Sequence, residues 1–138
     1  MSFSLEPSPI VLDVSFAVEV IEGGEASLAA LADQVGKTAL LLVPPHFWTE
    51  TANALLRGRK LSAADVNARL ERLKAVGVSV AEGGRSGIVE AIGLADRHRL
   101  SVYDAAYLQL VLDVEGTLAT LDAGLGRAAK AEGVPLLL

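Results

Sequence analysis

Short aliphatic runs alternate with longer segments of helical periodicity along this chain. A strand that is buried on both faces is almost wholly apolar, so this alternation is typical of an α/β domain with a central, mostly parallel β-sheet. We predict about five strands, at residues 10–12, 40–43, 76–81, 117–121 and 134–138. Helices are predicted at residues 26–35, 45–57, 62–75, 88–97, 101–113 and 124–132.

The length and composition indicate one folded domain. With 138 residues the chain has room for a single hydrophobic core. Its hydrophobic share of 51% excludes a disordered chain, and the absence of cysteine from the sequence excludes disulfides, thiol nucleophiles and thiolate metal sites. We expect a single domain over residues 1–138, in which residues 1–8 form a loose N-terminal extension.

The sequence predicts neither a membrane segment nor a signal peptide. The longest uninterrupted apolar run, residues 39–45, is far shorter than the about 20 residues that cross a bilayer. The N-terminus has neither a basic start nor a long apolar run. We therefore expect a cytoplasmic protein without a membrane partner.

The charge is distributed unevenly. The whole chain carries a net charge of −5, which ordinarily argues against a nucleic-acid partner. Residues 57–74 nevertheless hold six basic and two acidic side chains, a net charge of +4. The surplus of acid must therefore lie elsewhere in the chain.

Four carboxylates stand at positions that need an explanation. Asp13 and Asp122 directly follow predicted strands, at the edge of an α/β sheet where ligands bind. Glu50 falls on or beside the apolar stripe of its helix, where an uncompensated charge costs several kcal/mol. Asp104 opens a helix that is apolar nearly all round, which indicates a buried helix.

Purely structural explanations are also open for these residues. Asp122 can cap the helix that follows it, and Asp104 can form a capping box with the serine three residues before it. Glu50 can belong to an internal salt bridge, to which His46, four residues earlier, contributes if it is charged. The residues after Asp13 are largely apolar, so we expect its carboxylate to be mostly buried.

A metal ion explains the charge pattern if the four carboxylates share one pocket. Without them, twelve basic residues face thirteen acidic ones, so the rest of the chain is almost neutral. Crowded carboxylates repel one another and take up protons unless a cation neutralises them. Mg²⁺ or Mn²⁺ suits an all-oxygen site, whereas zinc prefers Cys or His ligands. An acidic, metal-filled pocket of this kind commonly acts on phosphate esters.

Four segments of the chain follow one another in the order of one known family. They are residues 11–15, 43–55, 100–108 and 118–125, which contain the four carboxylates. On these segments the sequence resembles the PIN-domain family, specifically the VapC-type toxins of bacterial toxin–antitoxin pairs. The resemblance spans nearly the whole chain and implies a three-layer sandwich, in which helices flank the sheet.

The resemblance further implies a metal-dependent endoribonuclease. The family's catalytic and metal-binding quartet would correspond to Asp13, Glu50, Asp104 and Asp122. Ser15 and Thr120 would be its polar neighbours. Mg²⁺ or Mn²⁺ would activate a water that attacks an RNA phosphodiester in line, leaving a 5′-phosphate and a 3′-hydroxyl. A homodimer and inhibition by a cognate VapB-type antitoxin are implied as well.

Two questions stay open in the sequence. Arg57, Arg59 and Lys60 of the basic segment are candidate contacts for RNA phosphates, although a solvated helix face explains them equally well. The chain can also be a PIN-like binding module without catalysis, or a housekeeping RNA-processing nuclease. Metal binding by the quartet would distinguish a toxin from the binding module. An antitoxin gene immediately upstream would distinguish a toxin from the housekeeping nuclease.

Overall fold

A sheet of short parallel strands forms the centre of the computed structural model, which describes residues 9–36 and 40–138. Its strands are β1 (Ile10–Leu12), β2 (Leu41–Val43), β3 (Val78–Val80) and β4 (Thr117–Ala119). They lie in the order β3-β2-β1-β4 and confirm the predicted parallel α/β architecture. The expected extension at residues 1–8 lies outside the described residues.

The predicted fifth strand is reduced to a single bridge. Leu136 pairs in parallel with Leu118 of β4. Main-chain hydrogen bonds run from Leu118 N to Pro135 O at 3.0 Å and from Leu137 N to Leu118 O at 2.9 Å. Pro135 has no N–H and cannot extend the ladder, so the sheet has one strand fewer than expected.

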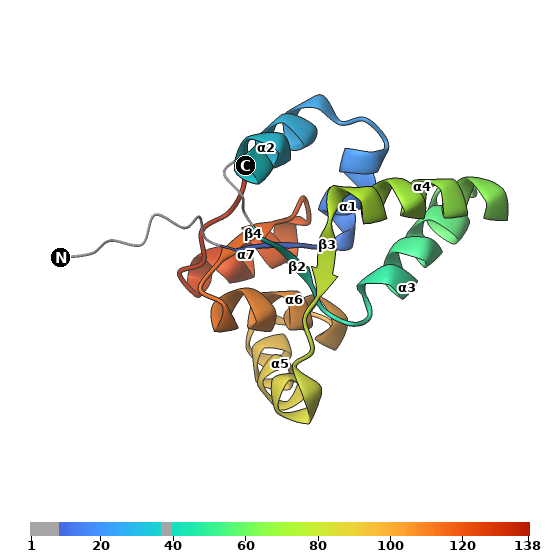
Figure 1. Ribbon diagram of the computed structural model, residues 1–138. Helices are drawn as coiled ribbons and strands as arrows, with labels where there is room; N and C mark the ends of the chain where they lie inside the picture. Colours follow the sequence, from blue (N-terminus) through green and yellow to red (C-terminus); the bar gives the residue numbers. More distant parts are fainter. Residues whose placement is uncertain (1–8, 37–39) are drawn as a thin grey trace.

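Helices flank the sheet on both sides. In chain order they are α1 (Val14–Ile21), α2 (Glu25–Gly36), α3 (Phe47–Asn53), the π-helical turn η1 (Ala54–Gly58), α4 (Ala63–Val76), α5 (Gly84–His98), α6 (Val102–Asp113) and α7 (Ala123–Ala131). Figure 1 shows α1, α2 and α4 on one side of the sheet and α5 and α6 on the other. Every predicted helix is present, whereas α1 was not predicted. Within the described ranges, no helix combines the length and apolar character needed to cross a membrane.

The hydrophobic core is centred on β1 and on α6, which packs against this strand. The three residues of β1 are at most 1% exposed, and α6 packs against this strand with Tyr107 and Leu108 buried. Burying a large aliphatic side chain contributes about 1.5–3 kcal/mol, so β1 is firmly held. Asp13 directly follows Leu12, so a well-packed strand positions it.

Candidate active site

Asp13 is a buried carboxylate at the junction of β1 and α1. It is 4% exposed and caps α1, accepting a 3.0 Å hydrogen bond from Phe16 N at Oδ1. Ser15 Oγ donates to the same oxygen at 2.7 Å, and Thr120 Oγ1 donates to Oδ2. Burial raises the pKa of Asp13, against which these three hydrogen bonds act in the opposite direction. The expected burial is confirmed, and the carboxylate also has a capping role.

Ser15 and Thr120 connect the ends of β1 and β4. Besides donating to Asp13, Ser15 Oγ accepts a hydrogen bond from Leu121 N at 2.9 Å. Thr120 Oγ1 accepts from Asp122 N at 3.0 Å. The two predicted polar neighbours therefore contact Asp13 directly and fix the backbone that leads to Asp122.

Glu50 is held by two side chains through one of its oxygens. Tyr107 OH donates to Oε1 at 2.9 Å, and His46 Nε2 lies 3.2 Å from the same atom, one helical turn earlier. Burial alone would raise the pKa of Glu50, but the contacts with His46 and Tyr107 outweigh it and lower the pKa. His46 thus supplies the contact expected for an internal salt bridge, which is an ion pair when the imidazole is protonated.

Asp104 lies in the first turn of α6, and Asp122 is the N-cap residue of α7. Asp104 N donates to the capping Ser101 Oγ at 3.0 Å, and Asp122 caps α7 by accepting from Leu125 N at 2.7 Å. The cap expected at Asp122 is therefore present, and so is the serine half of the capping box expected at Ser101. They account for the backbone of Asp104, but not for the surroundings of its carboxylate.

The negative charges of these four residues act on one another. Burial first, and then the charges of Asp122 and Glu50, raise the pKa of Asp104. The charge of Asp104 in turn contributes to the raised pKa of Asp13. Carboxylates from the ends of two strands and from two helices therefore lie within electrostatic reach of one another.

The carboxylates do not form a gathered ligand set in their present positions. Across the described residues, no three acidic or histidine side chains are grouped closely enough to hold a metal ion as they stand. Like charges favour this separation. In these positions Oδ2 of Asp122 caps α7, and Tyr107 and His46 hold Oε1 of Glu50.

Neither His46 nor Tyr107 was predicted as a functional residue, and His46 was considered only as a salt-bridge partner of Glu50. Tyr107 is 1% exposed and belongs to the hydrophobic core, yet its hydroxyl reaches Glu50. His46 Nε2 also lies 3.1 Å from Tyr103 O. The signal available for Tyr107 was its helical spacing, since it follows Asp104 by three residues.

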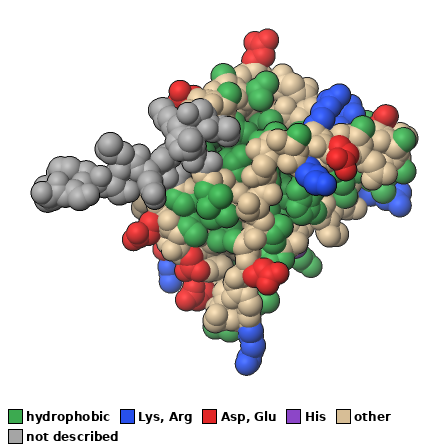
Figure 2. Space-filling view, viewed as in Figure 1, with side chains coloured by type: hydrophobic (Ala, Val, Ile, Leu, Met, Phe, Trp, Pro, Cys, Tyr) green, Lys and Arg blue, Asp and Glu red, His purple; other side chains and the backbone are tan. Residues whose placement is uncertain are grey.

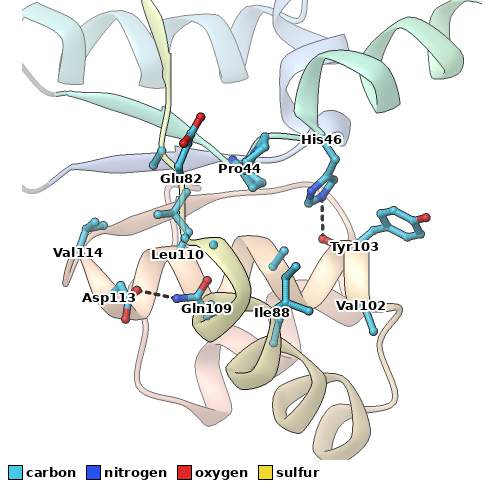
Figure 3. Close-up of a pocket in the computed structure, with 17 residues that line it drawn as sticks. Pro44, His46, Glu82, Ile88, Val102, Tyr103, Gln109, Leu110, Asp113 and Val114 are labelled. Atoms are coloured by element: carbon cyan, nitrogen blue, oxygen red, sulfur yellow. Dashed lines mark hydrogen bonds between the residues drawn. The ribbon is translucent and has the colours of Figure 1, made fainter.

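An apolar hollow of about 680 Å³ opens beside His46. It lies between the corner that follows β2, the loop before α5, and the facing sides of α5 and α6 (Figure 3). Its polar residues include Gln109 and Asp113, which are joined by a 2.6 Å hydrogen bond. His46 therefore stands between this hollow and Glu50.

The predicted phosphate contacts lie farther along the same helical segment as Glu50. Arg57 belongs to η1, Arg59 and Lys60 follow it, and all three are exposed. At 1.5 Å per residue, Arg57 is roughly 10 Å beyond Glu50 along the helix axis. Figure 2 shows basic side chains over the side of the molecule that carries α4.

Comparisons with known proteins agree with this architecture. The family model for the PIN domain matches residues 10–131. No curated protein sequence matches the chain significantly. Similar solved structures include PAE2754 from Pyrobaculum aerophilum, with a TM-score of 0.69 and 23% identity over 94% of this chain and 90% of that one.

Two further solved structures share the fold. VapC20 from Mycobacterium tuberculosis, described as a sarcin–ricin loop cleaving toxin, has a TM-score of 0.66 and 18% identity over 86% of this chain and 94% of that one. FitAcB from Neisseria gonorrhoeae has a TM-score of 0.64 and 18% identity over 94% of this chain and 96% of that one. At such low sequence identities, these TM-scores show a likeness of fold alone.

Proposed function

Because this chain belongs to the PIN domain family, we propose that it is a metal-dependent endoribonuclease and the toxin of a toxin–antitoxin pair. One observation carries the proposal: Glu50, Asp104 and Asp122, from three helices, are close enough for the charges of the other two to raise the pKa of Asp104. Such electrostatic crowding is typical of functional sites. The description of the structurally similar VapC20 as a toxin that cleaves RNA at the sarcin–ricin loop supports the substrate class.

The residues present fit a hard divalent cation. Every candidate ligand is a carboxylate oxygen, which Mg²⁺ and Mn²⁺ prefer. A cation would also relieve the repulsion that raises the pKa of Asp104. The residues proposed to hold it are Asp13, Glu50, Asp104 and Asp122. When bound, such an ion lowers the pKa of a coordinated water and stabilises negative charge on a phosphate.

The remaining residues of the site orient these carboxylates. Ser15 and Thr120 each donate to one oxygen of Asp13, which fixes the plane of that buried carboxylate. Tyr107 and His46 hold Oε1 of Glu50. Outer hydrogen bonds of this kind orient metal ligands and raise their affinity. The reaction that we propose is hydrolysis of an RNA phosphodiester to a 5′-phosphate and a 3′-hydroxyl.

An apolar face along α5 supports the proposal of a homodimer. Ile88, Val89 and Ile92 are 55%, 58% and 52% exposed, and Tyr103 of the adjoining α6 is 63% exposed. Contiguous exposed apolar side chains mark protein–protein contact surfaces. We propose that a second copy of this chain covers this face, while a VapB-type antitoxin is the inhibitory partner.

Cleavage of RNA by the purified protein tests the proposed function. We expect cleavage with Mg²⁺ or Mn²⁺ that stops in EDTA, and growth arrest on expression that a cognate antitoxin relieves. Asp13→Ala and Asp104→Ala should each abolish cleavage. If these variants cleave as well as the wild type, the activity belongs to a contaminating nuclease and the proposal fails. RNA binding without metal affinity would instead identify a binding module.

A further inference from the structure

A second hollow, of about 490 Å³, adjoins the start of α7. It is lined by His98, Arg99 and Leu100 from the turn between α5 and α6, and by Gly124, Arg127, Ala128 and Ala131 from α7. The same two elements lead directly to the carboxylates, because Asp104 follows this turn and Asp122 caps α7. The hollow is therefore adjacent to the candidate active site.

Two arginines of this hollow have no partner among the described residues. The neighbouring basic side chains are paired with Glu132. Its Oε2 lies 2.8 Å from Arg97 Nη1 and 2.6 Å from His98 Nε2. Arg99 and Arg127 are exposed and form no ion pair or hydrogen bond through their side chains in the described part of the chain. Their guanidinium groups are therefore available to a ligand.

The position of Arg127 is tied to that of Asp122. A Cβ built on Gly124 would lie 3.4 Å from Asp122 Oδ2 and 3.9 Å from Arg127 Nη2. These two atoms consequently lie no more than 7.3 Å apart, the total of those distances. They nevertheless do not form an ion pair. A negatively charged ligand beside Asp122 is thus within reach of Arg127.

The backbone holds Arg99 in place. Arg99 is the C-cap residue of α5, with a left-handed φ of 55° and an N–H that bonds to Ala95 O. The lining of this hollow also has apolar side chains, among them the partly exposed Leu100 and the exposed Ala131. Cationic groups beside apolar side chains suit a nucleotide, whose phosphate is anionic and whose base has an apolar face.

We propose that this hollow binds one nucleotide of the RNA strand next to the scissile bond, with Arg99 and Arg127 on its phosphate. The inference rests on the proposed function and adds a substrate subsite to it. Arginine suits this role because its planar fork binds phosphate oxygens in pairs. The subsite adjoins Asp122, whereas Arg57, Arg59 and Lys60 lie at the far end of η1 and would contact more distant phosphates.

Binding of a short single-stranded RNA in EDTA tests this subsite without cleavage. We expect Arg127→Gln and Arg99→Gln each to weaken binding about fivefold to tenfold. Because both arginines contact one phosphate, the double variant should lower the slope of log Kd against log salt by about 0.7, the value for one lost phosphate contact on a single strand. Arg85→Gln is the matched control, because Arg85 is an exposed arginine at the opposite end of α5. It should change neither quantity.

The outcomes separate this inference from the proposed function. If the two hollow variants bind RNA with the affinity and salt slope of the wild type, the subsite is wrong, even when the protein cleaves RNA. If they lose RNA binding while the metal-loaded wild type cleaves no RNA, the subsite stands and the nuclease proposal fails. If the two hollow variants bind RNA as the wild type does but no longer bind polyglutamate, the hollow binds an acidic protein segment and the proposal is overturned.

Discussion

The hydroxyl of Tyr107 on α6 donates a 2.9 Å hydrogen bond to Oε1 of Glu50 on α3. Burial and the nearby carboxylate of Glu50 raise the pKa of Tyr107, so the phenol stays protonated and remains a donor at neutral pH. His46 Nε2 lies 3.2 Å from Glu50 Oε1 and 3.1 Å from Tyr103 O, and both of these oxygens are hydrogen-bond acceptors. Both contacts fix Glu50 through one oxygen, which under the proposed function leaves Oε2 for a cation.

Replacing Tyr107 by phenylalanine should weaken metal binding. Tyr107→Phe keeps the buried ring and removes the donor to Glu50. We expect Mn²⁺ affinity to fall about tenfold, as for other groups that orient a metal ligand. Isothermal titration with Mn²⁺ measures this change. Tyr103→Phe is the control, because its ring is 63% exposed. Equal Mn²⁺ affinity in Tyr107→Phe and the wild type would show that this hydrogen bond does not position Glu50.

Removing the charge of Asp104 should stabilise the metal-free protein at neutral pH. Burial and the charges of Asp122 and Glu50 raise the pKa of Asp104 above 3.8, so the folded state binds its proton more tightly than the unfolded state. The free energy of unfolding therefore falls as the pH rises through the folded pKa. Asp104→Asn does not ionise, so its free energy of unfolding should be higher than that of the wild type at pH 7. The difference should be at most about 1 kcal/mol, because water screens a half-exposed carboxylate.

Thermal unfolding in EDTA at neutral and acidic pH measures the effect of Asp104→Asn. The advantage of the variant should shrink as the pH is lowered, because the wild-type carboxyl then takes up its proton. Asp65→Asn is a matched control, because Asp65 occupies the same position after the capping serine of α4. It should lose a small stabilisation by the helix N-terminus. A variant Asp104→Asn that is less stable than the wild type at pH 7 contradicts the electrostatic crowding.

Two substitutions of Asp122 separate its capping role from its proposed metal-binding role. Asparagine is as good an N-cap as aspartate, whereas alanine at this position costs about 1 kcal/mol. Asp122→Asn should therefore unfold near the wild-type temperature, and Asp122→Ala should be less stable. Both should lose RNA cleavage, since both lack the carboxylate. Full cleavage activity in Asp122→Asn would reduce Asp122 to a helix cap.

Replacing Thr51 by valine should stabilise the fold. Thr51 is 0% exposed, and its Oγ1 has no hydrogen-bond partner in the described part of the protein. Burying an unpaired hydroxyl is unfavourable, so Thr51→Val is expected to raise the free energy of unfolding by about 1 kcal/mol. Denaturant unfolding measures it, with the exposed Thr49→Val as control. A loss of stability in Thr51→Val would reveal an interaction of this hydroxyl.

The fold was largely predictable because its strands are short apolar runs between helical patterns. The exception is α1, which has the sequence VSFAVEVI and buries most of its residues. This segment is only eight residues long and follows β1 almost directly, and so short an apolar run cannot be told from a strand by its periodicity alone. The missing fifth strand follows from Pro135, whose lack of an N–H ends the pairing after one bridge.

The candidate site was predictable as a set of residue types, but not as a geometry. The positions of Asp13 and Asp122 after strands are visible in sequence, and so are their alternative roles as helix caps. The contact between Glu50 and Tyr107 joins residues 57 positions apart, which no local pattern predicts. The same limit applies to the hollow beside Arg127, which forms where α7 meets the turn between α5 and α6.

The most direct test of the metal-binding proposal is a crystal of this protein soaked in MnCl₂ and measured for anomalous scattering. The account predicts one or two strong peaks coordinated by carboxylates from the set Asp13, Glu50, Asp104 and Asp122. The same soak of Asp104→Asn crystals should weaken or remove those peaks. Wild-type crystals that show manganese at other surface carboxylates, and none among these four, would contradict the account.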